Sequence, residues 1–311
     1  MLAIVNVIAP IFALIGLGYC AVRFKLFPAS GIDSLIAFVN NFATPCLLFY
    51  SMVTSDFRSA FNLAIIGPYY LGAFVCFGVG IFVAVRFYGN TKGEGVSSGF
   101  SAMFTNTVLV GLPIVARAYG EGAMPVLFSI IGVHGAILIT TGMLTMELMR
   151  RDGRPLGEAL LIAARRIAVN PLLWGIALGL AANFMGVTLI EPVDAFLTMM
   201  ASAVVPAALF GIGGALNEYK LSENWSQALV LSLTKLVLHP AICYVLMVWL
   251  LRVPLETARY GILLSAMPAG INSYVFATYY NRGVSVAANT ILIGTVGSAL
   301  TIAMWLYLLS L

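Results

Sequence analysis

The sequence predicts an all-α polytopic membrane protein with ten transmembrane helices arranged as two inverted five-helix repeats. Three observations lead to this fold class: the composition, the spacing of the apolar stretches and an internal repeat. Hydrophobic residues make up 61% of the chain and charged residues only 9%, whereas a soluble domain carries about 25% charged residues. So few charges cannot cover a water-facing surface, and we expect lipid to surround most of the chain.

Ten apolar stretches are long enough to cross a bilayer, which requires about 20 residues per helix. They cover residues 2–22, 32–50, 61–85, 96–116, 123–146, 167–186, 193–216, 226–251, 260–280 and 284–310. The first stretch lacks a preceding basic segment and is too long for the core of a signal peptide, so we interpret it as a retained helix. The short alternating segments typical of β-barrel strands are not visible.

The basic residues predict the orientation of these helices. Eleven of the sixteen Lys and Arg residues fall in the odd-numbered loops and four in the even-numbered loops. Because cytoplasmic loops are enriched in Lys and Arg, this bias predicts odd loops in the cytoplasm and both termini outside the cytoplasmic (inner) membrane. The longest and most basic loop contains "LGEALLIAARRI", which predicts an amphipathic helix on the inner surface. The net charge of +4 is explained in this way, and we expect no nucleic acid partner.

An internal repeat divides the chain into two halves. At an offset of 161 positions, landmark residues of several helices coincide, including Pro10 with Pro171, Gly18 with Gly179 and Pro45 with Pro206. We therefore expect a first repeat at 1–146, a basic linker at 147–166 and a second repeat at 167–311. Five helices per half is an odd number, so the second half enters the membrane from the opposite side. Inverted repeats of this kind are typical of secondary transporters.

Helix 4 (96–116) and helix 9 (260–280) are interrupted at matching positions of the two repeats. The interrupting residues are Thr105, Asn106, Thr107, Gly111 and Pro113 in helix 4, and Pro268 and Gly270 in helix 9, with Asn272 and Ser273 just beyond. A broken helix is tolerated in a membrane only where protein or water satisfies its backbone. Paired breaks near the midplane indicate a transport site, and freed amides at a helix start suit a carboxylate. For Pro113 alone, a simple packing kink is about as good an interpretation.

Ionisable and polar residues inside the apolar stretches give further candidates. Lys235 and His239 lie four residues apart in helix 8, hence on one face. A lysine at this depth predicts a substrate counter-charge or a proton-linked switch, and a structural pair bound to freed backbone is the alternative. His134 and Asn41 are candidates for coupling or for lining the substrate path, with bonding between helices as the alternative.

The sequence offers no enzymatic chemistry. The four cysteines fall inside apolar stretches without metal-binding spacing, so they are interpreted as small packing residues. No phosphate-binding GxxxxGK[ST] loop is present, which argues against ATP-driven pumping. We therefore expect no metal, no cofactor and no catalytic residue.

Four segments carry a resemblance to a known family: "NNFATPCLLF", "TNTVLVGLP", "KLVLHP" and "MPAGINSYVFATYYN". They resemble the auxin efflux carrier family, which includes the plant PIN-formed auxin exporters and bacterial malonate or malate carriers. The resemblance implies an architecture similar to that of the sodium/bile-acid symporters, with helices 4 and 9 crossed. It also implies a scaffold of helices 1, 2, 6 and 7, a homodimer formed through that scaffold, and a transport unit of helices 3–5 and 8–10. In the family pattern, Asn106 matches the crossing asparagine, Pro268 the second crossing proline, and Ile271 a position whose backbone faces the substrate.

Two departures from the plant pattern argue against auxin itself as the substrate. Thr105 stands where the plant pattern has a proline, and Ala269 where it has a glutamine. We therefore expect a secondary carrier for small carboxylates such as malonate or malate, working by alternating access. The alternatives are a sodium-coupled symporter of larger amphipathic anions and a membrane receptor that binds a ligand without moving it.

Overall fold

The computed structural model describes residues 2–54, 62–150, 157, 161, 164–165, 168–169, 171–217 and 224–310. Within these ranges the chain is helical, and its one β-type contact is an isolated bridge between Thr105 and Ala269. The predicted inner-surface helix, and with it most of the basic linker at 147–166, falls largely outside the described residues.

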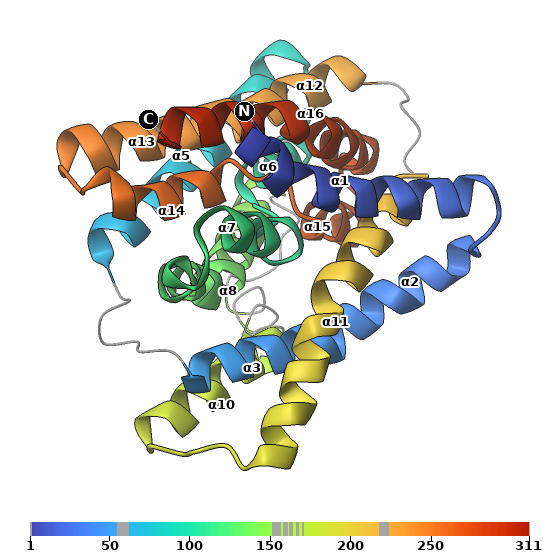
Figure 1. Cartoon of the computed structure of the whole chain (residues 1–311). Coiled ribbons are helices and arrows are strands. Elements are labelled where there is room, and N and C mark those ends of the chain that lie inside the picture. Colours follow the sequence, from blue (N-terminus) through green and yellow to red (C-terminus); the bar gives the residue numbers. More distant parts are fainter. Residues whose placement is uncertain are drawn as a thin grey trace.

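One group of helices, here called the first group, packs around the long helix α11 (Figure 1). Its members are α1 (Leu2–Arg23), α2 (Ala29–Phe38), the π-helix η1 (Val39–Ala43), α3 (Thr44–Thr54), α10 (Pro171–Phe184) and α11 (Glu191–Ala215). Glycines let these backbones approach closely. A Cβ atom on Gly18 of α1 would lie 2.0 Å from the carbonyl oxygen of Phe210 in α11, and one on Gly179 of α10 would lie 2.7 Å from that of Phe49 in α3. Close contacts through small residues are a general means of packing membrane helices.

The remaining helices form a second group. They are α5 (Leu63–Phe87), α6 (Lys92–Met103), η2 (Thr107–Gly111), α7 (Leu112–Tyr119), η3 (Glu121–Ala123), α8 (Met124–Arg150), α12 (Trp225–Leu233), η4 (Thr234–Leu238), α13 (His239–Tyr244), η5 (Val245–Leu250), α14 (Leu255–Ser265), α15 (Asn272–Tyr280) and α16 (Val284–Ser310). α6 packs against α5 and α8, and α12 packs against α16. α6 is rich in Gly and Ser, and ten of its twelve residues are buried.

Seven helices in the described part of the chain are long and apolar enough to cross a membrane. They are Ile4–Arg23, Ala29–Thr54, Leu63–Phe87, Glu121–Met149, Glu191–Ala215, Trp225–Leu250 and Val284–Leu309, and two shorter apolar helices cover Thr107–Tyr119 and Pro171–Phe184. Predicted helices 4 and 9 are each divided in two, as α6 with η2/α7 and as α14 with α15. The protein is thus a multi-pass membrane protein, and the count of ten crossings stays a prediction.

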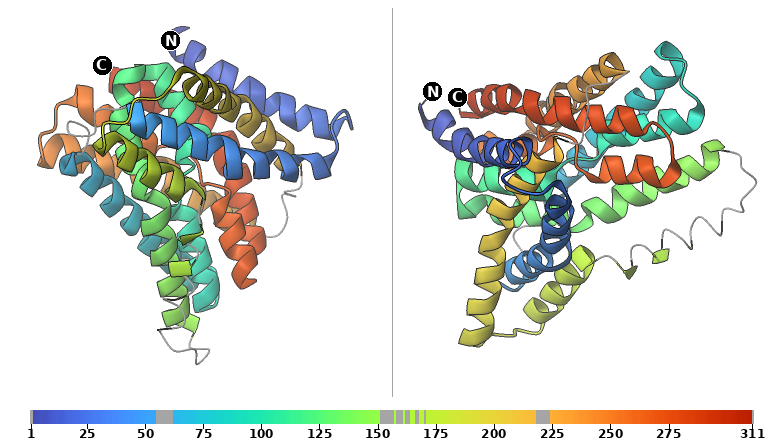
Figure 2. Two further views of the ribbon diagram at one scale, coloured as in Figure 1. Left: turned by 90° about the horizontal axis from the view of Figure 1, so that it is seen from below. Right: turned by 90° about the vertical axis from the view of Figure 1, so that its right-hand side faces the viewer.

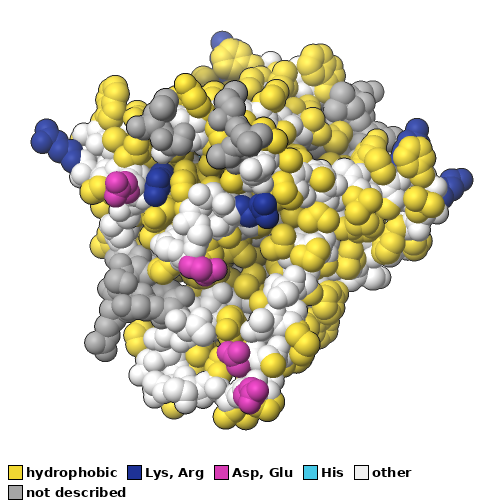
Figure 3. Space-filling view, in the orientation of Figure 1, with side chains coloured by type: hydrophobic (Ala, Val, Ile, Leu, Met, Phe, Trp, Pro, Cys, Tyr) yellow, Lys and Arg dark blue, Asp and Glu magenta, His cyan; other side chains and the backbone are white. Residues whose placement is uncertain are grey.

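The surface and the termini agree with a membrane setting. In the face seen in Figure 3, hydrophobic side chains predominate, and the few charged ones are widely scattered. The N- and C-terminal ends lie close together in both views of Figure 2 and in Figure 1. An even number of crossings would bring the termini to the same side.

Candidate functional site: a crossing of two broken helices beside a cavity

The two interrupted helices meet at their breaks and complete each other's backbone hydrogen bonding. α6 ends at Met103, and Phe104 adopts an extended backbone conformation. The Asn106 N–H donates to the Pro268 carbonyl oxygen, and the Gly270 N–H donates to the Phe104 carbonyl oxygen, each at 2.9 Å. This short antiparallel pairing satisfies groups that would otherwise be stranded inside the protein.

The interruption of helix 4 lies earlier than Gly111 and Pro113, which were expected to take part in it. The break covers residues 104–106, Gly111 belongs to the π-helix η2, and Pro113 lies in the first turn of α7. In η2 the Gly111 N–H bonds to the Asn106 carbonyl oxygen, five residues back. Pro113 lies in the first turn of α7, where a backbone N–H would have no acceptor within α7, so its missing N–H costs no hydrogen bond of that helix.

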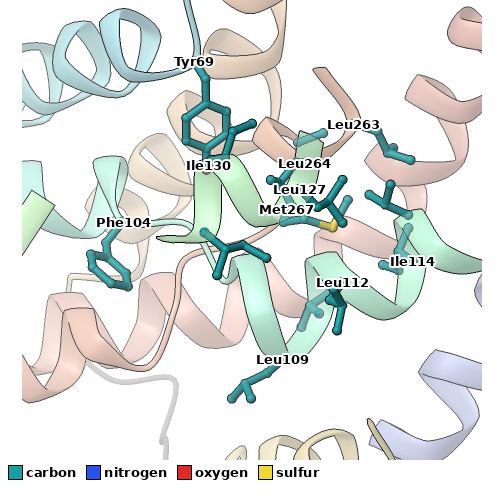
Figure 4. Close-up of a cluster of buried hydrophobic side chains, with 14 of the residues drawn as sticks. Tyr69, Phe104, Leu109, Leu112, Ile114, Leu127, Ile130, Leu263, Leu264 and Met267 are labelled. Carbon is teal, nitrogen blue, oxygen red and sulfur yellow. The ribbon is translucent and has the colours of Figure 1, made fainter. Parts of the chain in front are cut away.

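Gly111 instead permits close packing across the crossing. A Cβ atom at this position would lie 2.6 Å from Cδ1 of Leu264. Figure 4 shows Leu264 beside Leu127 and Met267 in the buried cluster around the crossing. Pro268 and Gly270 do lie in the break of helix 9, as expected.

A cavity of about 400 Å³ lies between the two helix groups at the crossing. From the first group it is lined by Asn40, Asn41, Thr44, Leu48, Val169, Pro171, Leu172, Leu173 and Ile176, and from the second by residues 104–109, 131, 134–136, 139, 270–272 and 275. None of these lining residues is Asp, Glu, Lys or Arg. A bound anion would therefore be held by neutral polar groups and by the ends of helices.

Two helices begin at the cavity with their positive ends. η2 begins at Thr107 and α15 at Asn272, and both residues line the cavity. The N–H groups of Thr107, Ser273 and Tyr274 donate to carbonyl oxygens just before each helix. The helix dipole still places partial positive charge at both starts. Asn106 precedes η2, yet its side chain makes no capping bond to it. The amide of Asn106 is therefore available to a ligand.

The first group faces the cavity with a π-helix. Asn40 and Asn41 lie in η1, where the extra residue per turn changes the direction of the side chains. Segments of this kind are frequent at functional sites. Thr44 follows directly, and its buried hydroxyl oxygen has no hydrogen-bond partner. Asn41, predicted as part of the substrate path, is thus a cavity residue.

His134 also lines the cavity, packed among aromatic rings. Its ring centroid lies 4.9 Å from that of Phe104 and 5.9 Å from that of Tyr69. Neither ring nitrogen makes a hydrogen bond of standard geometry, although the Thr105 backbone is near enough to interact with the ring.

Lys235 and His239 do not line the cavity. The Lys235 ammonium donates to the carbonyl oxygen of Ser265 at 2.6 Å and lies 2.9 Å from Nδ1 of His239. The ammonium can only donate hydrogen bonds, so Nδ1 of His239 accepts one from it. His239 therefore carries its proton on Nε2, which donates to the carbonyl oxygen of Tyr69 at 3.0 Å. This pair belongs to a buried hydrogen-bond network that joins α5, η4, α13 and α14.

Sequence reasoning missed part of the cavity wall. Phe104, Thr44 and the start of α10, with Pro171, Leu172 and Ile176, line the cavity but were not predicted. The signal for Thr44 was its position three residues after Asn41, about one helical turn. Apolar wall residues carry no such signal, because any lipid-facing residue has the same character. In the described part of the chain no cluster of His, Cys, Asp or Glu could hold a metal ion.

A comparison with known families matches residues 3–306 to the family described as "Membrane transport protein", which contains the auxin efflux carriers. The chain belongs to this family. It is 28% identical over 321 residues to a "Putative malonate transporter" of Rhizobium meliloti (strain 1021), covering 99% of this chain and 97% of the relative. It is 23% identical over 361 residues to "Auxin efflux carrier component 8" of Arabidopsis thaliana, covering 99% and 98%.

A third relative is an "Uncharacterized transporter" of Methanothermobacter thermautotrophicus, 22% identical over 306 residues, with 95% of each chain covered. The family and these relatives are transporters and not enzymes. The resemblance stated from the four sequence segments is confirmed.

Proposed function

We propose that this protein is a secondary carrier of small organic anions, of the malonate or malate class, across the cytoplasmic membrane. The observation that carries the proposal is the cavity at the crossing, where two helices begin and the Asn106 amide is uncommitted. Helix starts and neutral amides bind carboxylates without a lysine or arginine in contact. The name of the Rhizobium meliloti relative supports malonate as the first substrate to test.

Alternating access follows if the second group moves as a transport unit against the first group as a scaffold. Two contacts within the first group support an inverted repeat. Gly18 packs on Phe210, and Gly179 packs on Phe49, so each residue of one pair lies 161 positions from its counterpart in the other. We further propose ten membrane crossings, a homodimer formed through the scaffold helices, and both termini outside.

Coupling to protons, or transport without coupling, fits the site better than coupling to sodium. A sodium site needs several oxygen ligands, often carboxylates, and the described cavity wall has no acidic residue. His134 is the one titratable group among the lining residues.

The proposal is tested by uptake of labelled malonate into vesicles that hold the purified protein, with wild type compared with Asn106→Ala. We expect saturable uptake and counterflow for wild type. The variant loses one hydrogen bond to a carboxylate, worth about 1.5–3 kcal/mol, so its affinity should fall roughly tenfold to a hundredfold. Gly16→Ala is the matched control, because nothing lies within 4 Å of the added Cβ atom.

Saturable binding of malonate without flux or counterflow would favour a receptor over a carrier. An Asn106→Ala protein that transports like wild type would refute the site, because the break in helix 4 would then be a structural feature only. Uptake driven by a sodium gradient and not by a pH gradient would refute the proposed coupling.

A further inference from the structure

Lys235 is the one Lys, Arg, Asp or Glu among the fully buried residues of the described chain, with 0% of its surface exposed. Its hydrogen bonds go to neutral acceptors, the Ser265 carbonyl oxygen and the His239 ring. In the described residues no carboxylate pairs with it, so its positive charge is not cancelled locally. A buried charge of this kind is costly in a membrane and is usually functional.

The group that Lys235 binds is the end of a helix. Ser265 is the last residue of α14, and the two residues Ala266 and Met267 separate it from the segment that forms the crossing. The last carbonyl groups of a helix lack partners within it, and they carry the negative end of the helix dipole. Lys235 therefore caps α14 from a neighbouring helix and places a full positive charge against a partial negative one.

Four helix ends meet around the crossing. Two are negative C-terminal ends, those of α6 at Met103 and of α14 at Ser265, and two are positive N-terminal ends, those of η2 and α15. Each end carries roughly half an elementary charge, so the four together nearly cancel. A site with no net field would have little preference for an anion over a neutral molecule of the same shape.

We propose that Lys235 makes the crossing selective for anions by capping the C-terminal end of α14. The lysine charge exceeds the partial negative charge at the end of α14. The partial positive charges of the two N-terminal ends at the cavity then exceed the partial negative charge at the end of α6. Lys235 does not line the cavity, so it is a positioning residue that acts through the helix end and the field. His239 holds the ammonium in place and is itself held by the Tyr69 carbonyl oxygen. The inference rests on the proposed carboxylate site.

The test separates charge from hydrogen bonding. Lys235→Gln keeps an N–H donor for the Ser265 carbonyl but removes the charge, and Lys235→Arg keeps both. For each purified protein, dissociation constants for malonate and for its neutral diamide are measured by competition with labelled malonate. The ratio of the two constants reports anion selectivity and does not depend on the fraction of folded protein.

We expect the selectivity ratio to fall at least about tenfold in Lys235→Gln. Tenfold is roughly the effect of the lysine charge on one carboxylate at about 10 Å with an effective dielectric constant near 20, and malonate has two carboxylates. Lys235→Arg should stay within about threefold of wild type, because the charge is retained. A ratio unchanged in Lys235→Gln would overturn the proposal, and so would equal losses in the Gln and Arg variants.

A second pair of variants keeps Lys235 in place, in case its replacement prevents folding. Cys76 lies near enough to Lys235 to interact with it electrostatically. Cys76→Asp should cancel the lysine charge and lower the selectivity ratio, whereas the isosteric Cys76→Asn should not. Equal ratios in these two variants would overturn the proposal. A wild-type protein that binds no carboxylate would refute the proposed function, whereas normal malonate binding with charge-independent ratios would refute only the role of Lys235.

Discussion

At the scale of single residues, two polar side chains that line the cavity make no hydrogen bond that stabilises the fold. Asn106 does not cap η2, and the Thr44 hydroxyl is buried without a partner. Unsatisfied polar groups inside a protein are costly and call for an explanation. A ligand with acceptor oxygens in the cavity would supply that explanation for the Asn106 amide.

Asn41 tests whether the scaffold wall contacts the substrate. It lies on the wall opposite the crossing, so its amide can reach a second carboxylate of a dicarboxylate ligand. In Asn41→Ala we expect malonate affinity to fall about tenfold, the cost of one hydrogen bond to a charged group, with little change for acetate. Binding of both acids is measured by competition with labelled malonate.

Phe42→Ala is the control, because Phe42 is 61% exposed and does not line the cavity. It should leave both affinities unchanged. If Asn41→Ala lowered the affinities for malonate and acetate equally, Asn41 would not be the residue that binds the second carboxylate.

At the scale of elements, three of the four π-helical segments in the described chain contain residues singled out by chemistry, the exception being η5. η1 contains Asn40 and Asn41, η2 begins at Thr107, and η4 contains Lys235. A π-turn inserts one residue into a helix, so it redirects side chains without ending the helix.

Close packing of α1 on α11 gives a prediction about stability. Gly18→Ala would place a Cβ atom 2.0 Å from the Phe210 carbonyl oxygen, so the helices must separate. Overpacking of this kind typically costs about 1–3 kcal/mol, and we expect a melting temperature in detergent several degrees lower. Gly16→Ala, in the same helix with nothing within 4 Å, should not lower it. Equal melting temperatures would show that the helices adjust freely.

The start of α6 gives a pH-dependent prediction. The Glu94 carboxylate accepts hydrogen bonds from the Thr91 hydroxyl at 2.7 Å and the Thr91 N–H at 2.8 Å, and these bonds lower the pKa of Glu94 below its ordinary 4.5. A carboxyl whose pKa is lowered by folding stabilises the fold above the unfolded-state pKa, and this contribution is lost as the pH falls through the folded-state pKa.

Glu94→Ala should therefore cost about 1 kcal/mol at pH 7, and the difference from wild type should shrink as the pH falls below about 4. Thermal unfolding in detergent across this range measures the difference. Thr91→Ser retains the hydroxyl and should behave like wild type. A difference that persists at low pH would mean that the charge of Glu94 has no role.

At the scale of the whole molecule, two helix groups enclose the cavity between them, and the termini lie together (Figure 2). A site between two bodies that can move is the arrangement required for alternating access. Tight glycine contacts hold the first group together, whereas the crossing holds the second group together through backbone bonds.

The proposed topology predicts that epitope tags at both termini react with a reagent that cannot cross the membrane, in intact cells. The eleven basic residues in the odd loops are expected to keep those loops inside, because Lys and Arg resist translocation. A tag on the loop at 147–166 should react only after the membrane is opened. If one terminus alone is accessible from outside, the number of crossings is odd and the inverted repeat is wrong.

The sequence by itself determined the all-helical membrane class, most of the apolar helices and the segments in which predicted helices 4 and 9 are interrupted. The ten crossings and the inverted repeat stay predictions. Composition and segment length are set by the solvent, so they can be read without the fold. The polar triplet at 105–107 and the proline at 268 pointed to the crossing because a broken helix is tolerated inside a membrane only where protein or water satisfies its backbone.

Only the tertiary structure decided which side chains share the cavity. For Lys235 the sequence left two interpretations open, a group that faces the substrate and a structural pair with His239 bound to freed backbone. The ammonium bonds to the Ser265 carbonyl oxygen and to His239, because the end of α14 lies beside η4. Gly111 and Pro113 lie within a continuous helical segment, because η2 is a π-helix. No local sequence pattern predicts this π-helix. Contacts between distant segments depend on how helices pack, and that information is absent from the order of residues along any one helix.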